Sequence, residues 1–460
     1  MTSVQCGNQC PGGPTEDYRA IADDLAAEIA AGRLRPGDRL PPQRTFARSR
    51  GIAVSTAGRV YRELTSRGLV VGEVGRGTFV RAAAPACGPA LAEPAAARID
   101  LELNHPHVPE QTALLAEGLG RLLRPDALEQ ALRPVGASGT AAARSAVAAM
   151  LTRDDWAPDP AHILFAGSGR SAIAAAIAAQ VPPGGRLGVE ALTYPVVKAI
   201  AARLGVVPVP VETDEGGMRP DALAATHRST PLRAVYLQPT LHNPFGTTMG
   251  PQRRAEFAAV LRQADLYAIE DSVWAFLHRD APPPLAALAP ERTILIDSLT
   301  KRLAPGLTVG FAVAPEARIA PLAAALRSGA WPAARFALDA ATRWLTDGTA
   351  ETLVLAKREE VAARRKIADR SLAGFTVRAD PQACSIWWEL PEPWRAETFV
   401  AAAARRSIAV TPGAAFVVGA GQAPNAVRLG LASPSREILA GALDTLAAIA
   451  AGSPEDSVPD

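Results

Sequence analysis

The sequence predicts an α/β protein with two folded units, a winged helix-turn-helix at residues 15–81 and a larger body with a mostly parallel sheet at residues 100–451. Three observations support this prediction. In the first unit, three segments with helical spacing precede two short strand-like segments. Residues 82–99 are rich in Ala and Pro without periodicity, which is typical of a flexible linker. Beyond residue 100, short apolar runs alternate with Ala-rich helical stretches, which indicates a parallel sheet covered by helices.

The composition favours a globular protein without a membrane segment or a metal site. Of 460 residues, 48% are hydrophobic and 20% are charged, enough for two or three domains. No stretch approaches the roughly 18 uninterrupted apolar residues of a membrane span, and residues 1–13 lack the apolar region of a signal peptide. The four cysteines form no zinc-binding set with nearby histidines: Cys6, Cys10, Cys87 and Cys384. We therefore expect a cytoplasmic protein with reduced thiols and no bound metal.

The first unit begins with a helix, because Tyr18, Ile21, Leu25 and Ile29 are spaced to share one face and Gly32 follows as a stop. Two more helices are expected at 43–50 and 54–67, followed by two strands at 69–73 and 77–80. A glycine-containing turn at 74–76 joins the strands. Three helices followed by a hairpin are typical of a winged helix-turn-helix.

Positive charge is concentrated in this unit. Between Arg33 and Arg81 there are eleven arginines and three acidic residues, a local excess of eight positive charges. Arginine binds phosphate through two parallel hydrogen bonds, so the excess predicts contact with double-stranded DNA. The alternative is that the arginines only keep a small interaction domain soluble. The residues predicted to contact an operator lie in the second helix, the third helix and the wing: Arg44, Ser55, Thr56, Arg59 and Arg76.

This unit resembles the GntR-type winged helix in four places. They are residues 32–41 (GRLRPGDRLP), 44–47 (RTFA), 59–61 (RVY) and 75–80 (GRGTFV). Ala53 and Val54 stand where many members carry Ser and Arg at the start of the recognition helix. The operator sequence therefore does not follow from the resemblance.

In the body, the apolar runs predict strands and the Ala-rich stretches predict helices. Strands are expected at 163–165, 187–189, 207–211, 234–237, 267–269 and 293–296. Helices are expected at 171–180 and 253–263, and after Pro315 at 319–326 and 351–371. A mixed β/α segment continues to about residue 451.

The strongest chemical motif is the loop 298–310 (SLTKRLAPGLTVG), which carries Lys301. A site for pyridoxal 5'-phosphate (PLP) needs a lysine on a rigid loop to form a Schiff base, with hydroxyl groups nearby for the phosphate. A lysine taken alone is more often a surface charge. Here Ser298 and Thr300 supply hydroxyl groups within the same loop.

Four more groups follow predicted strands, at the edge where open α/β sheets bind ligands. Asn243 follows the strand at 234–237, and Glu270 and Asp271 follow the strand at 267–269, where a carboxylate suits a pyridine nitrogen. Residues 167–170 (GSGR) end one strand and open a helix, whose free N–H groups bind phosphate. Tyr194 can stack on the cofactor ring. Each group alone is consistent with an ordinary turn, but together they favour a PLP site.

Residues 100 to about 450 resemble fold-type I aminotransferases, and the order of the two parts resembles the MocR-type subfamily of GntR regulators. Residues 190–195 (EALTYP) and 239–244 (PTLHNP) are especially similar to one branch of that subfamily. The resemblance implies a large PLP subdomain at about 150–315, a small C-terminal α+β subdomain at about 316–451, and a homodimer. It also implies the following site. Lys301 carries the cofactor as an aldimine and Asp271 pairs with the pyridine nitrogen, while Asn243 and Trp274 lie at the phenolic oxygen and Tyr194 on the ring. Ser168, Gly169, Ser298 and Thr300 hold the phosphate, and Arg428 binds an effector carboxylate.

Three positions depart from the family pattern. Trp274 replaces a Tyr, and an indole N–H donates a hydrogen bond but cannot accept one. Thr308 replaces an Arg that grips the phosphate, and Pro134 falls where a Tyr of the neighbouring subunit normally reaches it. We therefore expect PLP binding that is retained but weakened, with Arg170 or Arg302 as the residue that compensates.

Three functions remain open. In the first, the chain is a transcription regulator whose PLP-bound body senses an amino-acid-like or amine effector through Lys301. In the second, it is a working aminotransferase with an accessory DNA-binding unit. In the third, it is a regulator whose body has lost PLP. The basic first unit and the linker favour regulation, because an enzyme needs neither. The weakened phosphate site argues for sensing rather than efficient turnover.

Overall fold

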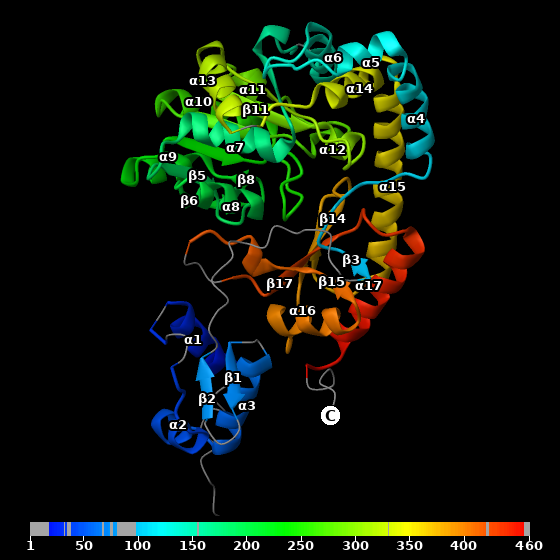
Figure 1. Cartoon of the computed structure of the whole chain (residues 1–460). Coiled ribbons are helices and arrows are strands. Elements are labelled where there is room, and N and C mark those ends of the chain that lie inside the picture. Colours follow the sequence, from blue (N-terminus) through cyan, green and yellow to red (C-terminus); the bar gives the residue numbers. More distant parts are fainter. Residues whose placement is uncertain are drawn as a thin grey trace, which may run out of the picture. The chain divides into compact units, whose positions relative to one another are not determined.

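The computed structural model describes residues 18–31, 33–34, 38–66, 69–73, 77–80, 98–153, 156–329, 331–419 and 423–454. The chain divides into two compact units, residues 1–87 and 88–460 (Figure 1). Three of the four cysteines lie outside the described residues, and the fourth, Cys384, is a buried free thiol. Within the described part, no group of three or more His, Cys, Asp or Glu side chains is arranged to hold a metal ion. Among these residues, no helix is both long enough and apolar enough to cross a membrane.

The first unit has the predicted order of elements. Its helices and strands are α1 (Tyr18–Ala30), α2 (Gln43–Arg50), α3 (Val54–Ser66), β1 (Val70–Glu73) and β2 (Gly77–Val80). The two strands pair antiparallel, and the backbone N–H of Leu40 donates to the carbonyl of Thr78 at 2.8 Å, which ties the preceding loop to the hairpin. The predicted turn at 74–76, with Arg76, lies outside the described residues.

A small apolar core holds the three helices of this unit together. It contains side chains from each helix and from the hairpin, among them Ile21, Phe46, Val60, Leu64 and Val80. Gly51 ends α2 with φ 69°, a left-handed conformation that suits glycine in the sharp turn between α2 and α3. The turn and the core together fix the angle at which α3 follows α2.

The body is built on a seven-stranded sheet. Its strands are β4 (Ile163–Ala166), β5 (Arg186–Glu190), β6 (Val207–Val211), β9 (Ala234–Leu237), β10 (Tyr267–Asp271), β11 (Thr293–Ser298) and β12 (Gly310–Val313), in the order β4-β12-β11-β10-β9-β5-β6. All six predicted strands are present. The sequence analysis missed β12, which runs antiparallel to both of its neighbours, while the other neighbouring pairs are parallel.

Helices cover both faces of this sheet (Figure 1). Ile269 packs into one apolar cluster with α7 (Gly169–Gln180), α8 (Pro195–Arg203) and α13 (Glu316–Ser328). Its neighbour Ala268 packs into another cluster with α9 (Pro220–Ser229) and α10 (Pro251–Gln263). Adjacent residues of a strand face opposite sides, so a strand buried on both faces has a continuous apolar sequence. The shorter elements of this region are the hairpin β7 (Thr213–Asp214) and β8 (Gly217–Met218), with α11 (Leu285–Leu288) and α12 (Leu299–Arg302).

A third apolar cluster joins the large sheet to helices that precede and follow it in the sequence. These helices are α4 (Gln111–Leu122), α6 (Ala141–Leu151) and α14 (Arg335–Thr346). The short helix α5 (Pro125–Ala131) lies between α4 and α6 in the chain. Phe165 and Phe311 of the sheet pack there with Trp344 of α14. The 23-residue helix α15 (Thr349–Ser371) then leads to a second, smaller sheet (Figure 1).

The smaller sheet has four antiparallel strands, in the order β13-β14-β17-β16. They are β13 (Val377–Arg378), β14 (Ser385–Glu389), β16 (Thr411–Pro412) and β17 (Ala426–Gly430). The helices α16 (Ala396–Arg405) and α17 (Arg436–Ala451) join its apolar core. A separate short pair, β3 (Ile99–Asp100) and β15 (Ile408–Ala409), ties the start of the body to this part.

The predicted domain boundaries remain predictions. At the end of the expected linker, 82–99, Ile99 belongs to β3 and pairs with the body, while 82–97 lie outside the described residues. The predicted subdomain boundary at about residue 315 precedes α13, whose Leu322 and Leu326 pack under the large sheet. Helix α14 packs on the same sheet in a separate apolar cluster.

Candidate functional site

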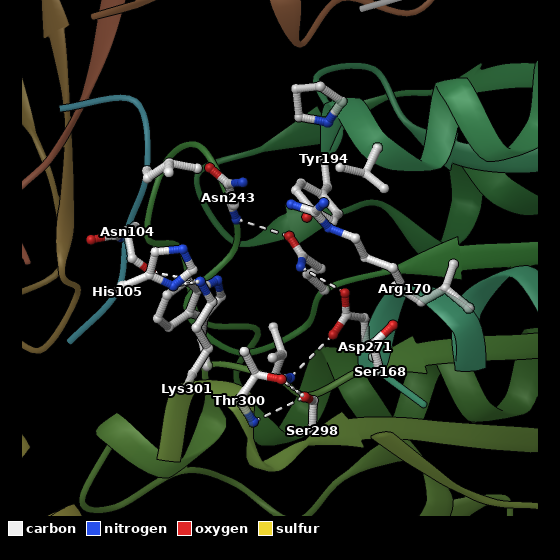
Figure 2. A pocket seen from close by; sticks show the side chains of 18 of the residues that line it. Asn104, His105, Ser168, Arg170, Tyr194, Asn243, Asp271, Ser298, Thr300 and Lys301 are labelled. Atoms are coloured by element: carbon white, nitrogen blue, oxygen red, sulfur yellow. Dashed lines mark hydrogen bonds between the residues drawn. The ribbon is translucent and has the colours of Figure 1, made fainter. Parts of the chain in front are cut away.

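A cavity of about 1210 Å³ lies where the strands of the large sheet end, and its wall includes parts of both sheets. All the cofactor and effector residues predicted from the sequence line it: Ser168, Gly169, Tyr194, Asn243, Asp271, Trp274, Ser298, Thr300, Lys301 and Arg428. Figure 2 shows most of them facing a common space. The structure thus brings together groups that are up to 260 positions apart in the sequence, from Ser168 to Arg428.

Two serine turns form one wall of the cavity. Ser168 caps α7 and accepts a hydrogen bond from the N–H of Ser171 at 3.1 Å. Ser298 caps α12, where its hydroxyl donates to the Thr300 hydroxyl at 2.8 Å. A Cβ at Gly310 would lie 2.2 Å from the carbonyl carbon and oxygen of Ser168, so only glycine allows the two turns to approach. Hydroxyl groups beside the start of α7 give a surface that fits an anion such as a phosphate.

Asp271 is held at the end of β10 by Tyr236 of β9 and by Gln238, the residue that follows β9. The hydroxyl of Tyr236 donates to its Oδ2 at 2.7 Å, and the amide of Gln238 donates to the same oxygen at 2.9 Å. Burial raises the pKa of Asp271 above its ordinary value. A buried carboxylate without a cationic neighbour fits a ligand that brings a protonated ring nitrogen.

Asn243 has an unused polar atom at the cavity. Its backbone N–H donates to the side-chain carbonyl of Gln238 at 3.1 Å, which fixes the loop that carries it. Leu241 in the same loop has φ 51°, a strained conformation for a residue other than glycine. Among the described residues, Oδ1 of Asn243 is buried and has no hydrogen-bond partner. The side chain is therefore available to a ligand with a polar group at this point.

Lys301 is an unusual lysine because its amine is buried inside the cavity wall. Its Nζ donates to the carbonyl of Asn104 at 2.7 Å and lies 2.9 Å from Nδ1 of His105. It also lies 5.2 Å from the centre of the Trp274 ring. Burial, together with the positive charges of Arg170 and Arg428, lowers the pKa of Lys301 to about 7. An amine with such a pKa is partly neutral at neutral pH and can act as a nucleophile.

A second buried lysine supports the turn that carries Lys301. Lys357 of α15 is fully buried, and its Nζ donates to the carbonyl of Lys301 at 2.9 Å and to that of Leu303 at 2.7 Å. These carbonyls end the short helix α12 and would otherwise lack partners. Burial lowers the pKa of Lys357 to about 7.

Arg428 is buried on β17, which excludes the simple alternative of an exposed strand arginine. Its Nη2 donates to the carbonyl of Glu102 at 2.6 Å and to the Thr411 hydroxyl at 3.0 Å. Burial lowers the pKa of Arg428. Its Nε is buried without a partner among the described residues, so it can donate to a carboxylate in the cavity.

Of the two arginines expected to compensate for Thr308, only Arg170 lines the cavity. Arg302 is buried elsewhere, where it donates to Oδ2 of Asp297 at 2.5 Å and lies over the Phe276 ring. Because Arg302 is held in this ion pair and does not line the cavity, the expectation for Arg302 is corrected. Thr308 itself lines the cavity, and Pro134 lies in the segment between α5 and α6.

Sequence reasoning missed four residues that build this site: Asn104, His105, Tyr236 and Gln238. Tyr236 lies in an apolar strand and Gln238 directly after it. The apolar pattern assigns this stretch to the core, so neither residue was predicted to belong to the site. Asn104 and His105 lie in the run Asn-His-Pro-His at 104–107, the one polar cluster between β3 and α4. That cluster was the signal available in the sequence.

In the first unit, α2 and α3 present the predicted DNA-contacting residues. Arg44, Ser55 and Arg59 are exposed, and Thr56 is half-buried. The Tyr61 hydroxyl donates to the carbonyl of Pro41 at 2.5 Å, which ties α3 to the loop before α2, and burial raises the pKa of Tyr61 to about 12. The exposed face of α3 thus stands on a fixed frame, as a recognition helix requires.

Comparisons with known proteins agree with both units. Residues 17–80 match the family of bacterial regulatory proteins, gntR family, and residues 99–446 match aminotransferase class I and II. The HTH-type transcriptional regulator YdeF of Bacillus subtilis is 30% identical over 91% of this chain and 90% of its own length. The vitamin B6 salvage pathway transcriptional repressor PtsJ of Salmonella typhimurium is 26% identical over 87% of this chain and 91% of its own.

A solved structure shows the same fold for the body. The α-aminoadipate aminotransferase LysN of Thermus thermophilus, complexed with N-(5'-phosphopyridoxyl)-L-leucine, matches with a TM-score of 0.70 and 25% identity. The match covers 78% of this chain and 93% of LysN. Aminotransferases of class I and II generally use PLP. The chain therefore belongs to the MocR-type GntR family, as a DNA-binding transcription regulator with an aminotransferase-like domain.

Proposed function

We propose that the aminotransferase-like body of this regulator binds PLP on Lys301 and senses an amino-acid-like or amine effector in the same cavity. The observation that carries the proposal is that Lys301 lines the cavity together with Asp271, Asn243 and the two serine turns. Its pKa of about 7 suits Schiff-base formation at neutral pH. PLP supplies an aldehyde that bonds reversibly to amines, so one cavity suffices for both the cofactor and an amine effector. A change in the ligand bound in the cavity would then alter the affinity of the first unit for DNA.

The other cavity residues fit the parts of PLP. Asp271 would hold the ring nitrogen, since its buried carboxylate accepts from the neutral donors Tyr236 and Gln238 and, within the described part of the chain, forms no salt bridge. Asn243 would bind the phenolic oxygen, while Tyr194 and Trp274 would enclose the ring. The hydroxyls of Ser168, Ser298 and Thr300, with the N–H of Gly169, would hold the phosphate.

Arg170 is our candidate for the cation that Thr308 does not supply. It lies one residue after Gly169 at the start of α7, lines the cavity, and is exposed. The start of a helix is an unfavourable position for a cation unless an anion is bound there. The binding of PLP is then retained but weaker than with an arginine at both positions.

Arg428 would bind the carboxylate of an effector, because its Nε is buried and unpartnered at the cavity. A working aminotransferase is the second candidate, since the lysine and the ring partners suffice for that chemistry. Weak cofactor retention favours sensing. The name of PtsJ connects that relative with vitamin B6, and for this chain it raises PLP itself as a possible effector.

For DNA, we propose that a homodimer binds two half-sites of an operator. Arg44, Ser55, Thr56 and Arg59 would contact bases and phosphates in the major groove, and Arg76 the adjacent minor groove. The exposure of Arg44, Ser55 and Arg59 supports this. Two-fold symmetry is common in both winged-helix regulators and aminotransferase folds.

An absorption titration with PLP tests the cofactor proposal. We expect wild type to gain the absorption band of a lysine Schiff base, and Lys301→Ala to gain none. Lys366→Ala is the matched control, because Lys366 is exposed on α15 and lies outside the cavity. If wild type gains no such band, or if Lys301→Ala keeps it, the proposal is wrong.

A further inference from the structure

The Lys301 amine is held by a segment that begins directly after the predicted linker. Its two acceptors, the Asn104 carbonyl at 2.7 Å and Nδ1 of His105 at 2.9 Å, both belong to residues 98–105. Figure 2 shows the His105 ring beside the amine. This contact is separate from the groups that fit the PLP ring and phosphate.

His105 is suited to accept a hydrogen bond rather than to carry charge. Burial, together with the positive charges of Lys301 and Arg170, lowers its pKa to about 4. The imidazole is therefore neutral at neutral pH. Because Lys301 donates to Nδ1, the ring proton lies on Nε2. The pair of acceptors then fits Lys301 both as an ammonium group and as a neutral amine.

The same segment is tied to the opposite end of the cavity. Arg428, the proposed effector ligand, donates to the carbonyl of Glu102 at 2.6 Å. The side-chain amide of Asn104 donates to Sγ of Cys384 at 2.9 Å. Ser433 accepts from the N–H of His105 at 3.3 Å. Lys301 and Arg428, the residues proposed to exchange with the amine and to bind the carboxylate of an effector, therefore both contact this one short segment.

On the basis of the proposed function, we propose that Asn104 and His105 form a dock for the Lys301 amine when an effector amine displaces it from PLP. Segment 98–105 would then transmit the effect of effector binding to the linker that precedes it in the chain. Lys301 leaves the aldehyde carbon of the cofactor as the incoming nitrogen bonds to that carbon. The two protons of the incoming amine end on Nζ, so the exchange needs no oxidant or reductant.

The dock distinguishes the two states of Lys301. While Nζ is double-bonded to the cofactor it carries at most one proton, so it cannot donate to both acceptors. The freed amine can donate to both. The one or two hydrogen bonds gained by the freed amine should slow the opening of segment 98–105 by about tenfold.

Two chemically fixed states test the dock. Sodium borohydride reduces the Schiff base and keeps Lys301 bonded to PLP, whereas aminooxyacetate forms an oxime with PLP and frees Lys301. Hydrogen exchange of peptides that cover 98–105 is then compared between the two states of the full-length protein. We expect exchange to be about tenfold slower in the aminooxyacetate state.

Three variants separate the dock from a purely structural role. In His105→Phe, one acceptor is lost and the difference should fall to about threefold. His105→Gln keeps an acceptor and should restore most of it. His107→Phe is the matched control, because His107 is exposed two residues beyond the segment, and it should behave as wild type.

Equal exchange in the two wild-type states, or an unchanged difference in His105→Phe, overturns the dock while the proposed function stands. If borohydride fixes no PLP on Lys301, the proposed function fails and the dock fails with it. A tenfold difference that depends on His105 and not on His107 supports the dock.

Discussion

At the scale of single residues, Lys301 differs from an ordinary lysine in its surroundings. Burial lowers its pKa to about 7, and above that pH the amine is neutral. Only the neutral amine attacks an aldehyde. The rate of Schiff-base formation with PLP should therefore rise with pH up to about 7 and then level off. Stopped-flow absorption across this range measures it, and a rate that still rises toward about pH 10, as for an exposed lysine, contradicts the assignment.

Arg170 and Thr308 give a second prediction at this scale. Arg170→Gln should weaken PLP binding by about tenfold to a hundredfold, because a charge-assisted hydrogen bond to the phosphate is lost. Binding of pyridoxal, which has no phosphate, should not change. Adding Thr308→Arg to Arg170→Gln should restore the PLP affinity. Equal losses for PLP and pyridoxal in a fluorescence titration would mean that Arg170 does not act on the phosphate.

At the scale of elements, the cavity depends on the contact between the turns before α7 and α12. Gly310→Ala places a Cβ against the Ser168 carbonyl, so we expect a loss of about 1–3 kcal/mol in stability and weaker PLP binding. Urea unfolding and the absorption titration measure the two effects. Gly306→Ala is the control, because nothing lies within 4 Å of a Cβ at that position. A Gly310→Ala protein that matches this control would show that the two turns are not coupled.

The strands β4, β9 and β11 of the large sheet were predictable because they are buried on both faces and therefore appear as continuous apolar runs. β12 was not predictable, because its residues follow directly on the Lys301 loop and form an antiparallel strand in an otherwise parallel sheet. Alternation along β10 points Asp271 to the cavity, while Glu270 accepts from the N–H groups of Leu285 and Ala286 on the other face. The sequence alone does not choose between these two carboxylates, and the resemblance to aminotransferases did.

The polar residues at the ends of strands were also predictable, since ligands bind at that edge of α/β sheets. The partners of Lys301 were not. Asn104 and His105 are nearly 200 positions away from it, and only the packing of β3 on β15 brings their segment to the cavity. The role of Arg302 was misjudged for a related reason. A buried aspartate, Asp297, captures it within the same loop.

At the scale of the whole molecule, the account requires that the first unit binds DNA through its arginines. Arg59→Gln should weaken binding to a duplex and lower the slope of log affinity against log salt by about one if Arg59 contacts phosphate. Arg327→Gln is the control, because Arg327 is exposed on α13 of the body. Fluorescence anisotropy at several salt concentrations gives both slopes, and equal slopes for the two variants would remove Arg59 from the interface.

The central claim, that this regulator holds PLP on Lys301, is tested most directly by borohydride reduction in the presence of PLP followed by peptide mass mapping. The account predicts that the phosphopyridoxyl group is found on the peptide with Lys301. Label on Lys198, Lys357 or Lys366 instead, or no label at all, would contradict it.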